Sequence, residues 1–138
     1  MPVTYTCATR YHVRVKTLLL LLLVPALAFA DKDFTSEKSA TWDCSKDATV
    51  TINHSNGKYT FKGACKDITI NGGHNTLSTE GVTTLTINGA SNAITADSVD
   101  TVAITGSDNK VSYKKSGGTG GKPAMTSLGQ NNKVTAAK

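Results

Sequence analysis

The sequence predicts an all-β fold, a small parallel β-solenoid (β-helix) of about five coils. Three observations predict it. A block recurs with a period of 17, opening in succession at Asp67, Thr84 and Thr101. Apolar and polar residues alternate within each block, as in strands buried on one face. A Gly and an Asn return at fixed places in every block. A unit this short buries its apolar face only against a stacked neighbour, so each block is a coil.

Residues 1–30 precede this domain and have the order of a secretory signal peptide. Basic residues come before an apolar run, residues 17–27, and small residues follow it. The run is too short for a membrane span, which needs about 20 apolar residues. We therefore expect translation to start at Val15, cleavage after Ala30, and a bacterial protein that is secreted or periplasmic and has no membrane span after cleavage.

Removal of residues 1–30 changes the charge of the chain. The precursor has 15 basic and 10 acidic residues, and the leader holds three of the basic ones and none of the acidic ones. The remainder has 12 lysines against 10 acids, a net charge of +2, and no arginine. Arginine makes the bidentate contacts to phosphate and guanine, so its absence argues against a nucleic-acid partner. The Lys114, Lys115 and Lys122 patch is interpreted as a solvated face and loop.

Two cysteines, Cys44 and Cys65, remain after Cys7 leaves with the leader. In a small exported domain such a pair predicts one disulfide. Closing a loop of this length contributes about 3 kcal/mol in the chain-entropy model. A metal or redox role is disfavoured because the chain has no Cys-x-x-Cys pair.

The elements follow in chain order. Residues 31–43 are expected to be a lead-in and cap, in which Phe34 or Trp42, or Phe61 from the first coil, covers an otherwise open apolar edge. Residues 44–138 are the repeat domain. Its first strand repeats upstream of the regular blocks, with one residue shifted across the first corner.

The last block returns at an offset of 23 rather than 17, since Gly129 matches Gly106. We place the extra residues in a Gly-rich loop at 117–123. The last strand pattern, around Val134, runs nearly to the end of the sequence, and nothing obvious is left to cap it.

The repeat assigns core and corner positions. The predicted core columns are Val50, Ile52, Ile68, Ile70, Leu77, Leu85, Ile87, Ile94, Val102, Ile104, Val111 and Val134. The predicted corner residues are Gly72, Asn75, Gly89, Asn92, Gly106, Asn109, Gly129 and Asn132. Gly permits positive φ at a tight corner, and Asn tolerates such backbone and bonds locally.

Three motifs carry a resemblance to a known family: Asp43-Cys44, then Gly63-Ala64-Cys65-Lys66, then Gly-x-x-Asn-x-apolar blocks ending in Gly129-Gln130-Asn131-Asn132-Lys133-Val134. The chain from Trp42 to Val134 resembles the bacterial exported domain-of-unknown-function family numbered three thousand and sixty. The first corner departs from its pattern, with His54 in place of Gly and Gly57 near the usual Asn. The resemblance implies a secreted repeat domain and carries no catalytic residue.

The chemistry-bearing residues point away from an enzyme. Acid–base catalysis needs clustered acids, often beside a basic residue. The acids of the repeats fall in different columns: Asp67, Glu80, Asp97, Asp100 and Asp108. His54 and His74 sit in successive corners, but no third ligand repeats there, so we interpret them as exposed corner residues. We expect no catalytic activity, no cofactor and no metal.

The outward residues of the first strand form a candidate binding face: Thr49, Thr51, Thr69, Thr84, Thr86 and Thr101. Such a T-x-T array resembles the ice-binding face of β-solenoid antifreeze proteins. Asp67 and Ala103 interrupt it, and Thr is an ordinary exposed strand residue.

The sequence thus favours a non-enzymatic binding or cell-surface module. Its solenoid face or its 117–123 loop would meet a cell-envelope, carbohydrate or protein partner. One alternative is a self-assembling homo-oligomer that pairs through the open C-terminal coil. The other alternative is ice binding through the Thr columns.

Overall fold

The computed structural model describes residues 31–138. The predicted signal peptide and the start at Val15 lie outside the described residues. The strands are β1 (Lys32–Phe34), β2 (Ser39–Asp43), β3 (Thr49–Ile52), β4 (Lys58–Asn71), β5 (Thr76–Asn88), β6 (Ala93–Thr105), β7 (Lys110–Lys115), β8 (Ala124–Leu128) and β9 (Lys133–Ala136). One 3-10 turn, η1 (Thr119–Gly121), lies between β7 and β8. Residues 31–138 contain no helix of the length and apolarity that a bilayer span requires.

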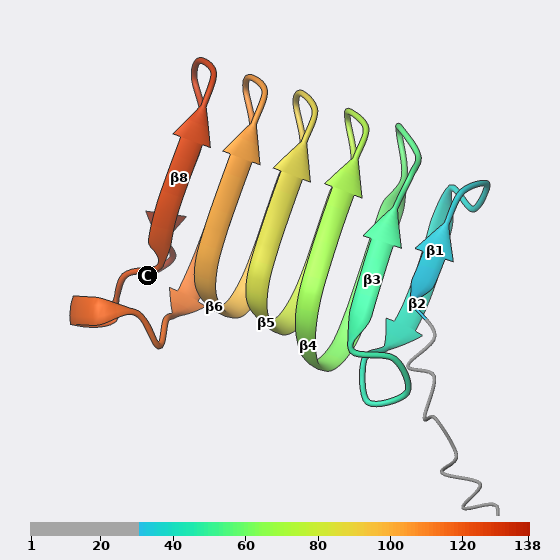
Figure 1. Cartoon of the computed structure of the whole chain (residues 1–138), viewed down its shortest axis with the longest axis horizontal. Coiled ribbons are helices and arrows are strands. Elements are labelled where there is room, and N and C mark those ends of the chain that lie inside the picture. The colour runs from blue at the N-terminus through green and yellow to red at the C-terminus, as the bar shows by residue number, and fades with distance from the viewer. Residues whose placement is uncertain (1–30) are drawn as a thin grey trace, which may run out of the picture.

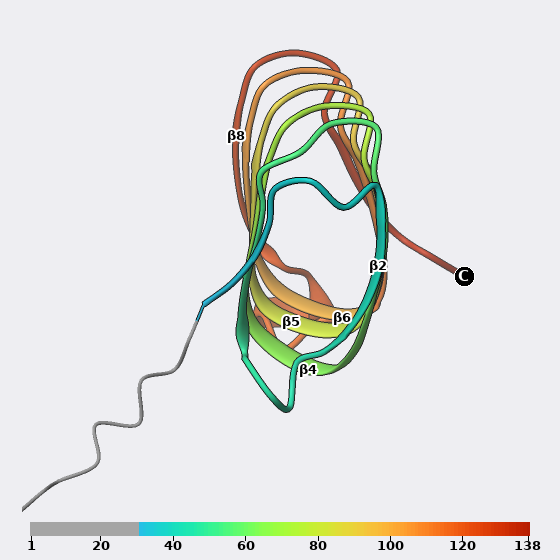
Figure 2. The same ribbon diagram turned by 90° about the vertical axis from the view of Figure 1, so that its right-hand side faces the viewer.

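Every strand pairing is parallel, and the chain winds as stacked coils with two flat faces (Figures 1 and 2). The first face contains β1, β3, the second halves of β4, β5 and β6, and β8. The second face contains β2, the first halves of β4, β5 and β6, then β7 and β9. The predicted β-solenoid of about five coils is confirmed. The lead-in adds β1 and β2 as a short further layer, here called the N-terminal rung (residues 31–47).

The strand register follows the spacing of the sequence blocks. Thr49 pairs with Asp67, an advance of 18, and the regular coils advance by 17, as from Thr84 to Thr101. The last coil advances by 23, from Thr101 to Ala124. The added residues lie between β7 and β8, in the segment that contains η1.

The second corner of each coil differs from the sequence prediction. A strand, corner, strand, corner unit was expected, but β4, β5 and β6 each continue without a break through that bend. Backbone pairing between β5 and β6 continues through the bend, where Gly81 pairs with Ser98 and Val82 pairs with Val99. Because the backbone ladder is kept, the chain curves there as one bent strand, and each of these three coils has a single tight corner.

The predicted core columns line the interior. All of these residues are buried except Val134, which is half-buried against the core. Complete burial of a Val, Leu or Ile side chain is worth about 1.5–3 kcal/mol, so the stacked columns supply most of the apolar stabilisation. Cys65, Val82 and Val99 fill the interior at the second bend.

In the tight corners, the residue with left-handed backbone is not the Asn that we predicted. The left-handed residue is the one before each Asn, as at His74 (φ 59°) and Ser91 (φ 58°). The Asn itself is buried, as at Asn92 (1% exposed). A Cβ on Gly89 would collide with the carbonyl oxygen of Gly72, so Gly is needed there for close stacking as well as for its positive φ.

Candidate functional site

The N-terminal rung is closed by aromatic side chains. Phe34 stacks on Phe61 (centroids 5.8 Å apart) and packs against Tyr59 (5.5 Å) and the edge of Trp42 (6.3 Å). The Lys32 ammonium lies 4.9 Å from the Phe34 ring centroid. The Tyr59 hydroxyl donates to the Glu37 carbonyl oxygen at 2.7 Å, and burial raises the pKa of that hydroxyl. These contacts cover the apolar end of the first coil.

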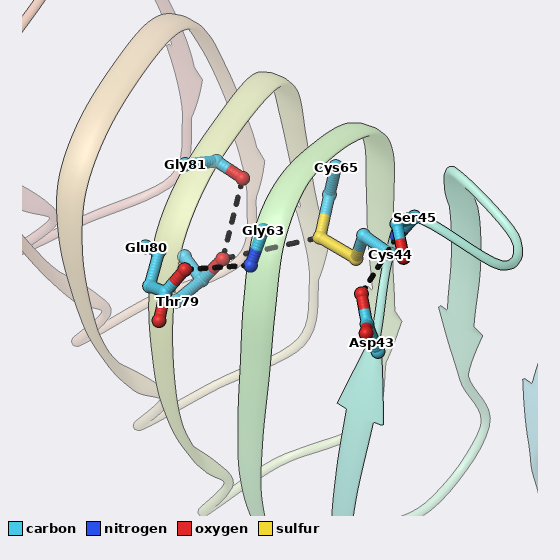
Figure 3. The surroundings of a disulfide bond; sticks show 8 residues. All are labelled: Asp43, Cys44, Ser45, Gly63, Cys65, Thr79, Glu80 and Gly81. Atoms are coloured by element: carbon cyan, nitrogen blue, oxygen red, sulfur yellow. Dashed lines mark hydrogen bonds between the residues drawn. A yellow bond between two sulfur atoms is a disulfide. The ribbon is translucent and has the colours of Figure 1, made fainter.

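The Cys44–Cys65 disulfide fastens this rung to the first coil, and the predicted pairing is confirmed (Figure 3). Both cysteines are 2% exposed. Beside them the Asp43 carboxylate accepts from the Ser45 backbone N–H at 2.9 Å. Hydrogen bonding by Ser45 lowers the pKa of Asp43. The surroundings of the disulfide are therefore those of a structural brace.

The opposite end lacks such closure; we call β8 and β9 the open end. Within the described chain, β8 is paired with β6 alone and β9 with β7 alone. Every residue of β8 is exposed, including Met125 (59%) and Leu128 (64%). Met125 continues the core column of Val102, so an interior position lies in solvent. A hollow of about 160 Å³ beside it is lined by Tyr113, Lys122, Pro123, Met125 and Val134.

A ladder of asparagines also stops at the open end. The Asn92 backbone N–H donates to Asn109 Oδ1, and the Asn109 N–H donates to Asn132 Oδ1, each at 3.1 Å. Each amide group donates to the preceding coil, as Asn109 Nδ2 does to the Gly89 carbonyl at 2.9 Å. The N–H groups of Gly129, Asn131 and Asn132 have no acceptor among residues 31–138. The equivalent N–H groups of the preceding corner, those of Gly106, Asp108 and Asn109, are all paired, so these three donors of the last corner remain available.

The predicted Thr face is in register on the first face. Thr51, Thr69 and Thr86 form one outward column, and Thr49, Asp67, Thr84 and Thr101 form the other. All these threonines are half-buried except Thr101, which is exposed. The second face has a hydroxyl column without interruption: Thr41, Thr60, Ser78, Thr95, Ser112 and Thr135. An outward hydroxyl column is therefore common to both faces.

The two histidines do not share a column. His74 aligns with Asn56, and His54 aligns with Gly72, in agreement with the departure noted in the first corner. The acids form local contacts: Asp97 pairs with Lys114 at 2.7 Å, and Glu80 accepts from the Gly63 N–H at 2.7 Å. Residues 31–138 contain no group of three or more His, Cys, Asp or Glu side chains placed to hold a metal ion.

The model of the family described as Protein of unknown function (DUF3060) matches residues 75–131. The resemblance to that family is confirmed. The DUF3060 segment runs from β5 to the last corner and includes the asparagine ladder from Asn75 to Asn109. No curated protein matches the chain, and no solved structure matches it. Because the family is described as one of unknown function, the DUF3060 match brings no site residue with it.

The sequence pattern located the core, the corners and the missing C-terminal cap, but it did not locate the free corner donors. A signal for them was present, because Gly129-Gln130-Asn131-Asn132 is the last corner among residues 31–138. The open end combines unpaired strands, free donors and an exposed core column. It is the surface of the described chain whose chemistry is least complete within one molecule.

Proposed function

We propose that this protein is a non-enzymatic binding or structural module, secreted or periplasmic, and that the open end is its working surface. One observation carries the proposal: both final strands pair on one side only, and every residue of β8 is exposed. Unpaired strand edges attract further strands, and proteins ordinarily blunt or cover them. At the N-terminal rung the outer edges of β1 and β2 are also unpaired, but aromatic side chains bury the core behind them. At the open end the core column is exposed at Met125.

Strand addition suits such a surface. A partner strand placed beside β8 or β9 would satisfy the free backbone groups, and side-chain pockets would give selectivity. The hollow next to Met125 is such a pocket. Its partner is a protein rather than a lipid, because backbone N–H and C=O groups stay unsatisfied in hydrocarbon.

The arrangement of the ionisable groups supports a role without catalysis. Asp97 is neutralised by Lys114, and both side chains are more than half exposed. Exposed acids that hold a local contact lack the burial that tunes a catalytic carboxyl group. The hollows along the second bend are open and lined by short polar or charged side chains such as Glu80 and Ser98.

Photo-crosslinking in the cells that make the protein tests which surface binds. A photoreactive amino acid replaces Met125 at the open end or, as the matched control, Thr101 on the first face; both positions are exposed. We expect a defined protein adduct from position 125 that disappears when Thr135→Glu is added, and none from position 101. Adducts from position 101 alone, or from neither position, would overturn the proposal.

A second candidate is ice binding, which the in-register Thr columns of the first face favour. Thermal hysteresis and inhibition of ice recrystallisation at high protein concentration measure it. Thr69→Lys and Thr86→Lys should abolish both activities, while Thr95→Lys on the second face should preserve them. Absence of both activities in the wild-type chain rejects this candidate.

A further inference from the structure

The two ends of the solenoid present matching strands. Each carries one unpaired edge on the first face (β1 or β8) and one on the second face (β2 or β9). Every pairing between them is parallel, so all strands of one face run in the same direction. If a second copy is stacked along the axis, its β1 lies beside β8 and its β2 beside β9, and both ladders continue in parallel.

The charges of the two ends are opposite. The N-terminal rung has five acidic side chains and three lysines. Residues 116–138 have three lysines and no acid, and β7 adds Lys110 and Lys115 beneath them, together with Lys114, which is paired with Asp97. Head-to-tail stacking brings an acidic end onto a basic end, whereas a two-fold pairing of open ends brings lysines onto lysines. Opposite charge steers association, and like charge opposes it.

The side chains of the two ends also differ in size in the same columns. The column that begins with Trp42 and Phe61 ends with Tyr113 and Ala136. The column that begins with Phe34 ends with Ser127. In these two columns, aromatic groups at the first end therefore face small residues at the last. Trp42 is only half-buried within one molecule, which leaves apolar area for a contact.

We infer that the partner of the open end is a second copy of this chain, which docks its N-terminal rung head-to-tail and extends the solenoid. The inference rests on the proposed function of the open end. A single peptide strand covers one edge, but another solenoid end covers both edges and the apolar interior together. Such a heterologous contact does not close on itself, so it generates open-ended oligomers.

Sedimentation velocity of the disulfide-bonded chain, purified after export, tests the inference over a hundredfold range of concentration. Head-to-tail stacking predicts oligomers that grow with concentration and shrink at high salt, since opposite charges are screened. A concentration-independent monomer overturns it. So does a dimer that stops at two copies and persists at high salt, because that is the two-fold arrangement.

Charge reversal separates the two geometries. Asp31→Lys with Asp33→Lys changes only the exposed N-terminal side of the contact, and Lys122→Glu with Lys133→Glu changes only the open end. Each variant alone should associate at least about tenfold more weakly, and an equal mixture should recover pairing through the two unchanged ends. Circular dichroism verifies folding, and Asp67→Lys in a middle coil is the matched control. Unchanged association of the first variant would overturn the head-to-tail contact.

The cross-linking experiment at position 125 distinguishes this inference from the proposed function. An adduct with twice the mass of the chain, joined to residues 31–47, supports both. An adduct with a different protein overturns the self-association and leaves the open end as the working surface.

Discussion

The first and last layers of this solenoid both lie at an end of the apolar core, but the first layer buries that core and the last leaves it exposed. In the N-terminal rung, Phe34 is 3% exposed although no strand of residues 31–138 lies on its outer side, because Trp42, Tyr59 and Phe61 surround it. At the open end, Met125 occupies a core column and is 59% exposed. A stack of identical coils leaves two bare ends, and within residues 31–138 side chains cover the first end and leave the last exposed.

The difference shows that the residues that cap an end of the solenoid are not those that form its repeated coils. The middle coils need only repeated Gly, Asn and aliphatic positions. The N-terminal rung departs from the repeat by adding aromatic groups and a disulfide. The last coil keeps the repeat corner, Gly129 to Asn132, so its asparagine ladder continues to the edge of the molecule. A repeat that is kept to the end leaves an end that can accept another layer.

Matched truncations of the two ends give the largest expected effect. Phe34→Ala should lower the free energy of unfolding by about 3–5 kcal/mol, because it empties a packed aromatic cluster. Met125→Ala should change it by less than about 0.5 kcal/mol in the dilute chain, because that side chain is exposed. Urea denaturation monitored by Trp42 fluorescence measures both. Equal losses would refute the contrast between a closed and an open end.

Removal of the brace should have the next largest effect. Cys44→Ala with Cys65→Ala should cost about 3 kcal/mol in the chain-entropy model. The loss of protection against hydrogen exchange should be greatest in the N-terminal rung. The protection of β8 and β9 should be the same in the variant and the wild-type chain when the two are compared at equal global stability. Hydrogen exchange resolved along the chain measures this distribution. The reduced wild-type protein serves as the control and should behave like the variant.

The asparagine ladder offers a graded comparison within one column. Asn92→Ala leaves the Asn75 N–H and the Gly72 carbonyl without their partners in a buried corner, at a cost of about 1–3 kcal/mol for each unsatisfied group. Asn132→Ala should cost less, because its corner is half-buried and water replaces the lost bonds. Thermal unfolding of both variants tests the order. A larger loss from Asn132→Ala would show that the last coil is closed by other contacts.

The smallest expected effect is a dependence of stability on pH that arises in the N-terminal rung. The pKa of Asp43 is lowered by hydrogen bonds from Ser45, so its contribution to stability is present above the ordinary Asp pKa and is lost as the pH falls through the lowered value. NMR titration should give an Asp43 pKa below 3.8. Asp43→Asn should flatten the acid limb of stability relative to the wild-type chain. An unshifted Asp43 would exclude this contribution.

Much of the fold could be predicted from periodicity because each coil repeats the same pattern of inward-facing residues and corner residues. Alternation fixed the inward positions such as Ile87 and Ile104, and the recurrence of Gly89 and Gly106 fixed the corners. The assignment of positive φ to the predicted corner column, from Asn75 to Asn132, was wrong, because a sequence column cannot tell a residue that bends the chain from one that bonds across coils. Ser91 bends the chain, and Asn92 bonds.

The amino-acid sequence by itself determined that the chain coils, how far each coil advances, and which side chains face inward, because these follow from local alternation and spacing. Only the tertiary structure decided that the second bend is a continuous strand, that Tyr59 joins the aromatic groups at the first end, and that backbone donors of the last corner are left free. Those features depend on which groups of neighbouring coils lie within hydrogen-bonding or packing distance. That is a property of the stacked layers and not of any one block.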